Sequence, residues 1–99
     1  MRGKNLNITV NLIATFKMLA GKSSLSLAME NGQSVLDAFF RVLEMVPALK
    51  PHWLGQDGQP QVFVHVFLNG NDAATLADGM QTKLHDGDCL DFIPPVAGG

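Results

Sequence analysis

Two segments near the start of the chain alternate strictly between apolar and polar residues, and this alternation constrains the fold more than any other feature. Every second residue is apolar in residues 6–12, and residues 24–29 repeat the pattern after Gly21. A period of two is typical of a strand with one buried face. We therefore predict an antiparallel opening pair of strands joined as a hairpin. The residues predicted to point inward are Ile8, Val10, Leu12, Leu25, Leu27 and Met29.

The pattern then changes to the three- and four-residue spacing of a helix. Ser34 is a favourable N-cap, because its hydroxyl can accept a hydrogen bond from an otherwise unpaired backbone N–H. Asp37 places negative charge in the first turn, where the helix dipole favours it, and Pro47 ends the helix. The apolar stripe predicted to face the sheet consists of Leu36, Phe39, Phe40, Leu43 and Val46.

The second half of the chain supplies further strands. Residues 48–61 are rich in Pro and Gly and contain the single Trp, which predicts an ordered surface loop. Residues 62–68 are apolar on both parities, as expected of a central strand, and Asn69-Gly70 predicts a turn after them.

A second turn signal, Asp86-Gly87, leads into a last strand over residues 89–93. The order strand, strand, helix, strand, strand requires one helix to cover one face of a mixed sheet of four to five strands. This is the β-grasp, or ubiquitin-like, arrangement of the α+β class. We expect it to form one domain over residues 1–93, because a chain of 99 residues supports one compact core.

Residues 94–99 form a short arm of unusual composition that follows the last strand. Two prolines lack backbone donors and fix φ, so the arm is expected to project in extended form over about 20 Å, at roughly 3.3 Å per residue. Glycine has no side chain, and two at the end suit the passage of a carboxylate through a narrow channel in another protein. The arm reads Pro94, Pro95, Val96, Ala97, Gly98 and Gly99.

These C-terminal residues resemble a known family. Asp86-Gly87-Asp88, followed by the segment from Phe92 to Gly99, is similar to the signature of the MoaD-type sulfur carrier, which is the small subunit of molybdopterin synthase, and of the related small archaeal modifier proteins. Three upstream segments resemble that family as well, so the resemblance covers nearly the whole chain. They are Phe16-Lys17-Met18-Leu19-Ala20-Gly21, Pro47-Ala48-Leu49 and Phe67-Leu68-Asn69-Gly70.

The resemblance implies a carrier rather than an enzyme. A partner of the ubiquitin-activating type would use ATP and Mg²⁺ to form an acyl-adenylate at Gly99, while this chain, monomeric when free, binds no cofactor or metal itself. Attack by persulfide sulfur would give a thiocarboxylate for molybdopterin synthesis, with the large subunit of molybdopterin synthase as partner. Attack by lysines of target proteins would instead give an isopeptide bond and make the chain a protein modifier. A lesser alternative is sulfur donation to tRNA.

Five residues are predicted to form a partner-docking surface on the face of the sheet away from the helix. Three of them alternate with the valines of residues 62–68 and so point to the opposite face, and the other two fall on the outward side of the first and last strands. An exposed apolar patch commonly marks an interaction site. The alternative is that residues 48–61 fold over them as a second small core. The five residues are Ile13, Phe63, His65, Phe67 and Ile93.

Charge and cysteine usage argue against several other classes. The net charge is −2, and seven scattered Lys and Arg residues do not form the basic face of a nucleic-acid binder. A lone cysteine, Cys89, cannot form an internal disulfide, which favours the reducing cytoplasm. The apolar stretch in residues 6–20 is too short and too polar for a membrane span or a signal peptide.

Metal and thiol chemistry find little support in the sequence. Of the three histidines, His52, His65 and His85, only His85 lies close to Cys89, with no second pair of zinc ligands. The segment Asp86-Gly87-Asp88 is too short for a calcium loop and predicts a turn. Neighbouring acidic residues are expected to raise the pKa of Cys89, which makes it a structural thiol.

Overall fold

The two alternating segments form antiparallel strands, as predicted. In the computed structural model, which describes residues 5–61 and 63–95, β1 (Asn5–Leu12) pairs with β2 (Ser24–Glu30). Ile8 lies opposite Leu27, and the apolar residues of both strands are buried while nearly all of their polar neighbours are exposed. Burial of one face fixes this register, because a shift by one residue would turn every apolar side chain outward.

The connection between β1 and β2 is more than a hairpin turn. It contains the short helix α1 (Thr15–Ala20), which buries Phe16 and ends at Gly21 with a φ of 74°. The Gly21 N–H donates to the Lys17 carbonyl at 3.0 Å. A helix of six residues is too short to show a helical period in the sequence, which is why the alternation alone did not predict it.

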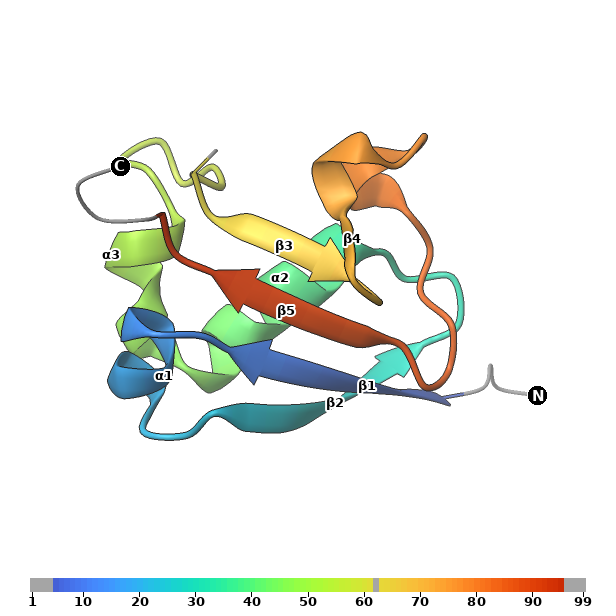
Figure 1. The fold of residues 1–99 in the computed structure, drawn as a ribbon, viewed down its shortest axis with the longest axis horizontal. Helices are drawn as coiled ribbons and strands as arrows, with labels where there is room; N and C mark the ends of the chain where they lie inside the picture. Colours follow the sequence, from blue (N-terminus) through green and yellow to red (C-terminus); the bar gives the residue numbers. More distant parts are fainter. Residues whose placement is uncertain (1–4, 62, 96–99) are drawn as a thin grey trace.

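Five strands form one mixed sheet in the order β2-β1-β5-β3-β4, with the long helix across one face (Figure 1). The later strands are β3 (His65–Leu68), β4 (Asn71–Asp72) and β5 (Cys89–Ile93). Strand β5 runs parallel to β1 and antiparallel to β3. This arrangement confirms the predicted β-grasp fold of the α+β class.

Strand β3 is shorter than predicted. It begins at His65, and Phe63 precedes it in a turn. The predicted turn after β3 is confirmed: Asn69 and Gly70 have φ values of 52° and 87°. Two positive φ values in a two-residue loop match the twist of the strands they join, so β3 and β4 form a tight hairpin.

The predicted start and end of the long helix are confirmed, whereas its buried stripe is displaced. Helix α2 (Val35–Met45) begins with a capping box, in which Asp37 N donates to Ser34 Oγ at 3.3 Å and Ser34 N donates to Asp37 Oδ2 at 2.8 Å. The prediction for Phe40 is wrong, because its side chain is 37% exposed at the margin of the helix. Leu36 and Val46 are only half-buried. The buried residues of α2 are Val35, Ala38, Phe39, Val42 and Leu43.

The prediction of a surface loop over residues 48–61 is wrong for the part up to Trp53, whereas residues 56–59 are exposed and irregular as predicted. Pro47 begins a 3₁₀ turn, η1 (Pro47–Leu49), and α3 (Lys50–Trp53) follows it. Trp53 is completely buried, and its ring centroid lies 4.8 Å from that of Phe39 and 4.6 Å from that of Phe92. The Pro and Gly residues correctly indicated the absence of long regular elements. They did not indicate that Trp53 would be buried and close one end of the core.

Two further 3₁₀ turns, η2 (Ala73–Thr75) and η3 (Gly79–Gln81), connect β4 to β5. They contribute Ala73 to the core, and Leu84 after them is also buried. In residues 5–61 and 63–95, no helix has the length and apolar character needed to cross a membrane.

The stacking of Trp53 predicts the cost of removing it. We expect Trp53→Ala to lower the free energy of unfolding by about 3–5 kcal/mol, because it empties the space between two aromatic rings. Trp53→Phe should cost about 1–2 kcal/mol, since stacking is retained and the indole N–H has no hydrogen-bond partner among the described residues. Urea denaturation measures both.

The neighbouring exposed residue supplies the control for this comparison. His52→Ala should change the free energy of unfolding by less than about 0.5 kcal/mol, as for an ordinary surface substitution. A loss for Trp53→Ala no larger than that of His52→Ala would show that the segment is a surface loop after all.

Candidate functional site

The arm follows a strand that is paired along both of its edges. β5 pairs on both sides, with Leu12 opposite Phe92 in the parallel ladder and His65 opposite Ile93 in the antiparallel ladder. The predicted turn before it is confirmed: Asp86 Oδ1 accepts from Asn7 N at 2.8 Å, which attaches the turn to β1. Hydrogen bonds on both edges therefore fix where the arm leaves the domain.

The root of the arm packs against the domain. Pro94 is half-buried and Pro95 is exposed. Both line a groove of about 280 Å³ next to α1, α3 and the turn before β3. Pro94, which was expected to belong to a projecting arm, is therefore partly packed against the domain. The groove is lined by Thr15, Phe16, Pro51, His52, Gln61, Phe63, Pro94 and Pro95.

The remaining arm residues, Val96, Ala97, Gly98 and Gly99, lie outside the described part of the chain. What the structure describes is their point of departure. In Figure 1, β5 ends beside α1 and α3, at the end of the sheet that these two short helices cover. The last backbone hydrogen bond on this side of β5 runs from Ile13 N to Phe92 O at 3.2 Å.

The five predicted docking residues lie on or beside the sheet face opposite α2. Ile93 and His65 are directly paired across β5 and β3, and Ile13 follows the end of β1 next to them. Ile13 is 39% exposed and Phe63 is 45% exposed. His65 is exposed as well, whereas Phe67 and Ile93 are half-buried. Ile13, His65 and Ile93 thus lie beside the root of the arm, whereas Phe67 lies further along β3, opposite Asp91.

The alternative reading of this surface, a second small core under residues 48–61, is contradicted. Leu49 and Trp53 from that segment are buried in the main core, on the side of the sheet that α2 covers. Phe63 lies next to residues of α3 in the groove beside the arm. Among the described residues, His65 remains exposed and Phe67 and Ile93 remain half-buried, so the segment does not bury this face.

Helix α1 adds two exposed apolar residues that the sequence did not reveal. Met18 is 76% exposed and Leu19 is 39% exposed. Their helix lies at the same end of the sheet as the arm root (Figure 1). The available signal was the apolar segment after the first strand, interrupted by Lys17. The sequence alone could not decide whether its apolar residues belong to the core or to the surface.

Cys89 belongs to a hydrogen-bonded cluster on this same face. Asn11 Nδ2 donates to Asp91 Oδ1 at 2.8 Å and to Cys89 Sγ at 3.2 Å. Burial raises the pKa of the Cys89 thiol above its ordinary value, and the negative charge of Asp91 raises it further. The predicted direction is confirmed, although burial is the larger cause and Asp91 is the acidic neighbour that contributes.

The residues considered as metal ligands do not converge. His85 Nδ1 lies 3.9 Å from Asp88 Oδ2, and the side chain of His85 is largely exposed. Asp88 instead accepts from His85 N at 2.7 Å and from Asn69 Nδ2 at 2.9 Å, which stabilises the turn before β5. Within residues 5–61 and 63–95, no three His, Cys, Asp or Glu side chains are grouped to hold a metal ion.

Comparisons with known proteins identify relatives over the whole fold. A protein-family model described as the ThiS family matches residues 10–99. Small archaeal modifier protein 3 of Haloferax volcanii is 34% identical over 94 residues, which cover 95% of this chain and all of that protein.

Solved structures show the same architecture. The crystal structure of SAMP1 from Haloferax volcanii matches with a TM-score of 0.85 and 28% identity, over 94% of this chain and 99% of that chain. A chain in the crystal structure of the BexX/CysO complex from Amycolatopsis orientalis matches with a TM-score of 0.70 and 26% identity, over 93% of this chain and 99% of that chain.

The raised pKa of Cys89 predicts a slow thiol. We expect iodoacetamide to alkylate Cys89 at pH 8 more slowly in the native protein than in the urea-unfolded chain, because less thiolate is present. The native rate should rise with pH as the thiol ionises. Asp91→Asn should increase the native rate a few-fold, since the thiolate fraction changes about tenfold per pKa unit.

The control for this experiment is Asp78→Asn, an exposed carboxylate outside the cluster. It should leave the alkylation rate unchanged. A native rate equal to or above the unfolded rate would contradict the protonated state of Cys89 that follows from its surroundings.

Proposed function

Because this chain belongs to the ThiS family of ubiquitin-like sulfur carriers and small archaeal modifier proteins, we propose that its C-terminal Gly99 is adenylated and then converted to a thiocarboxylate that delivers sulfur. Proteins of this kind are non-catalytic substrates of ubiquitin-activating-type enzymes and bind no cofactor. The sulfur acceptor that we propose is a pterin precursor in molybdopterin synthesis, bound by the large subunit of molybdopterin synthase.

The proposed chemistry begins with a poor electrophile. Attack of the Gly99 carboxylate on ATP gives an acyl-adenylate and releases pyrophosphate, with Mg²⁺ in the activating enzyme neutralising the phosphate charge. A persulfide sulfur of the partner then bonds to the acyl carbon, and AMP leaves. A second thiol then attacks the partner's sulfur in the resulting acyl disulfide and forms a new disulfide with it. This releases Gly99 as a thiocarboxylate. This chain contributes only the acyl group and its presentation.

The observation that carries the proposal is the way in which β5 leads into the arm. β5 is paired on both edges up to Phe92 and Ile93, and two prolines follow it immediately. A rigid root with restricted φ values limits the directions that the arm can take, and pre-organisation of this kind lowers the entropy cost of inserting it into a partner. In our proposal, residues 1–93 are the folded domain and residues 94–99 are the reactive unit.

We further propose that Ile13, Phe63, His65, Phe67 and Ile93 bind the activating enzyme. Their position supports this role, because Ile13, Phe63 and His65 are exposed and His65 pairs with Ile93, the residue directly before the arm. An enzyme that grips the arm must contact the domain at this place. The relative CysO, found in a complex with BexX, gives a precedent for a stable complex of this fold with another protein.

A second function has a specific observation in its favour. The relative that matches at 34% identity over its full length is named a modifier protein. If a lysine amine of a target protein attacks the adenylate, the product is an isopeptide bond at Gly99 and the chain becomes a tag. Sulfur donation to tRNA is a third outlet for the same thiocarboxylate. All three share the activation step and differ in the final acceptor.

Intact-mass spectrometry of the chain from its native cells tests the proposal. We expect a mass increase that corresponds to the exchange of one oxygen for sulfur, and deletion of Gly99 should remove it entirely because no acyl group remains at the required position. Val96→Ala keeps the length of the arm and serves as the matched control. Conjugates of higher mass that vanish with Gly99 would favour the modifier function instead.

The docking surface generates a separate prediction. Phe63→Asp should reduce the rate of adenylation by the activating enzyme at least about tenfold, because it places a charge in an apolar contact. Phe40→Asp has a comparably exposed side chain on α2 and should leave the rate unchanged. Pyrophosphate release measures both. Equal rates for wild type and Phe63→Asp would remove Phe63 from the proposed surface.

A further inference from the structure

Strand β2 lies at one edge of the sheet with outward backbone groups that lack a strand partner. Its neighbour in the sheet is β1. Leu12 N donates to Ser23 O at 2.9 Å. Because hydrogen-bonded and non-hydrogen-bonded pairs alternate along an antiparallel ladder, the odd-numbered residues of β2 form the backbone hydrogen bonds to β1. The N–H and C=O groups of Ser24, Ser26 and Ala28 therefore point away from the sheet. An edge of this kind is a template for another strand.

The sequence of β2 does not protect this edge. Edge strands are commonly blunted by lysine, proline or a bulge, whereas β2 reads SLSLAME and pairs with β1 in continuous register. Glu30 is its one charged residue, and Gln33 Oε1 accepts from Glu30 N at 2.8 Å. The edge is therefore closed at Glu30 and open along the small residues before it.

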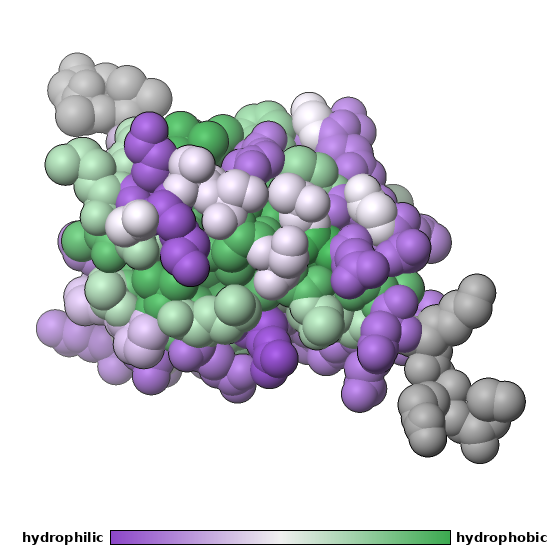
Figure 2. Space-filling model, turned by 90° about the horizontal axis from the view of Figure 1, so that it is seen from below, coloured by the Kyte–Doolittle hydropathy of each residue, from purple (hydrophilic) through white to green (hydrophobic). Residues whose placement is uncertain are grey.

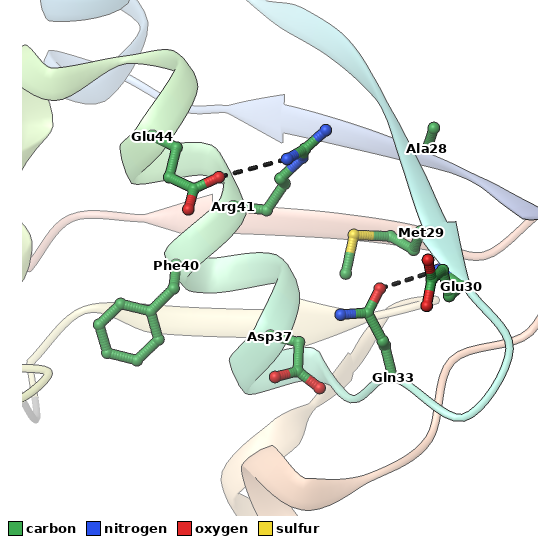
Figure 3. Close-up of a pocket in the computed structure, with 8 residues that line it drawn as sticks. All are labelled: Ala28, Met29, Glu30, Gln33, Asp37, Phe40, Arg41 and Glu44. Atoms are coloured by element: carbon green, nitrogen blue, oxygen red, sulfur yellow. Dashed lines mark hydrogen bonds and ion pairs between the residues drawn. The ribbon is translucent and has the colours of Figure 1, made fainter.

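A groove of about 410 Å³ lies between α2 and the last residues of β2, so it begins at Ala28, where the open edge ends. Figure 3 shows the side chain of Met29 reaching from β2 toward the helix, with Phe40 and Arg41 on α2. The view from the β2 side in Figure 2 shows hydrophobic surface across the centre and left, bordered by hydrophilic residues. The groove is lined by Ala28, Met29, Glu30, Gln33, Asp37, Phe40, Arg41 and Glu44.

The rim of this groove is acidic. Three carboxylates, from Glu30, Asp37 and Glu44, surround one guanidinium, that of Arg41. Arg41 Nη1 already lies 3.2 Å from Glu44 Oε1, so the positive charge is shared with a neighbour. A basic partner is attracted to such a rim, whereas a second copy of this chain brings the same negative charges and is repelled.

We propose that β2 and the groove beside it bind an extended, lysine- or arginine-flanked segment of a partner protein as an added sheet strand. Its backbone pairs with Ser24, Ser26 and Ala28, and its basic side chains lie against the acidic rim of the groove. Strands β1 and β5 separate this edge from β3. Binding at β2 therefore leaves the arm and the face around Ile93 free, and it does not depend on chemistry at Gly99.

The test uses a fluorescent peptide of four valines flanked by two lysines at each end, together with the full chain. Alternate N–H groups of an added strand face β2, so N-methylation of one alternate set of valines should weaken binding at least about tenfold while the other set is tolerated. Fluorescence anisotropy gives the affinities. Shifts of the amide NMR signals should centre on Ser24, Ser26 and Ala28.

Charge reversal supplies the matched pair of variants. Glu44→Lys should weaken binding of the peptide about tenfold, and a peptide with glutamates in place of lysines should bind weakly to the wild-type chain. Asp78→Lys changes the net charge equally at an exposed site outside the groove and should bind the lysine peptide as the wild type does. Both positions are on the surface, so both variants should fold.

Several results would overturn the proposal. Equal binding of both N-methylated peptides would mean attraction by charge without strand pairing. Equal loss in Asp78→Lys and Glu44→Lys would mean non-specific attraction. Absence of binding at about 1 mM peptide would exclude even a weak site. Dimers in sedimentation equilibrium that Ser26→Pro dissociates would assign the edge to a second copy of the chain.

Discussion

The pairing of β5 with two partners is the constraint on which the rest of the structure depends. The parallel ladder to β1 and the antiparallel ladder to β3 place Phe92 on the helix side, where Trp53 stacks on it. The same two ladders place Ile93 on the opposite face and direct Pro94 toward the groove beside α1 and α3. The core, the opposite face of the sheet and the start of the arm are thus all positioned by one strand of five residues.

Local signals predicted those parts of the fold that are decided locally. Alternation gave β1 and β2 with the correct buried residues, and Ser34 and Asn69-Gly70 act through hydrogen bonds or φ values within a few residues. The errors concern features decided by tertiary packing. Phe40 and Phe39 look equivalent in a helical repeat, and only the position of the sheet buries one and exposes the other. Trp53 is buried for the same reason, although its segment has the composition of a loop.

The candidate site was predictable to a similar degree. Parity correctly separated the accessible His65 and Phe67 from the buried Val66 and Leu68, because alternation along a strand holds wherever the strand lies. Phe63 is exposed as well, although it lies in the turn before β3. The contribution of α1, with Met18 and Leu19, follows from where the β1–β2 connection folds, and no periodicity records that. The family match over residues 10–99 adds what the fold alone does not supply, namely membership of the ThiS family.

The long sequence separation across the β1–β5 ladder has a consequence for synthesis. Asn11 bonds to Asp91, 80 residues later, so the inner edge of the first strand stays unpaired until almost the entire polypeptide has left the ribosome. Non-local pairing of this kind forms late in folding. An incomplete nascent chain therefore cannot complete the sheet, because β5 joins β1 to β3.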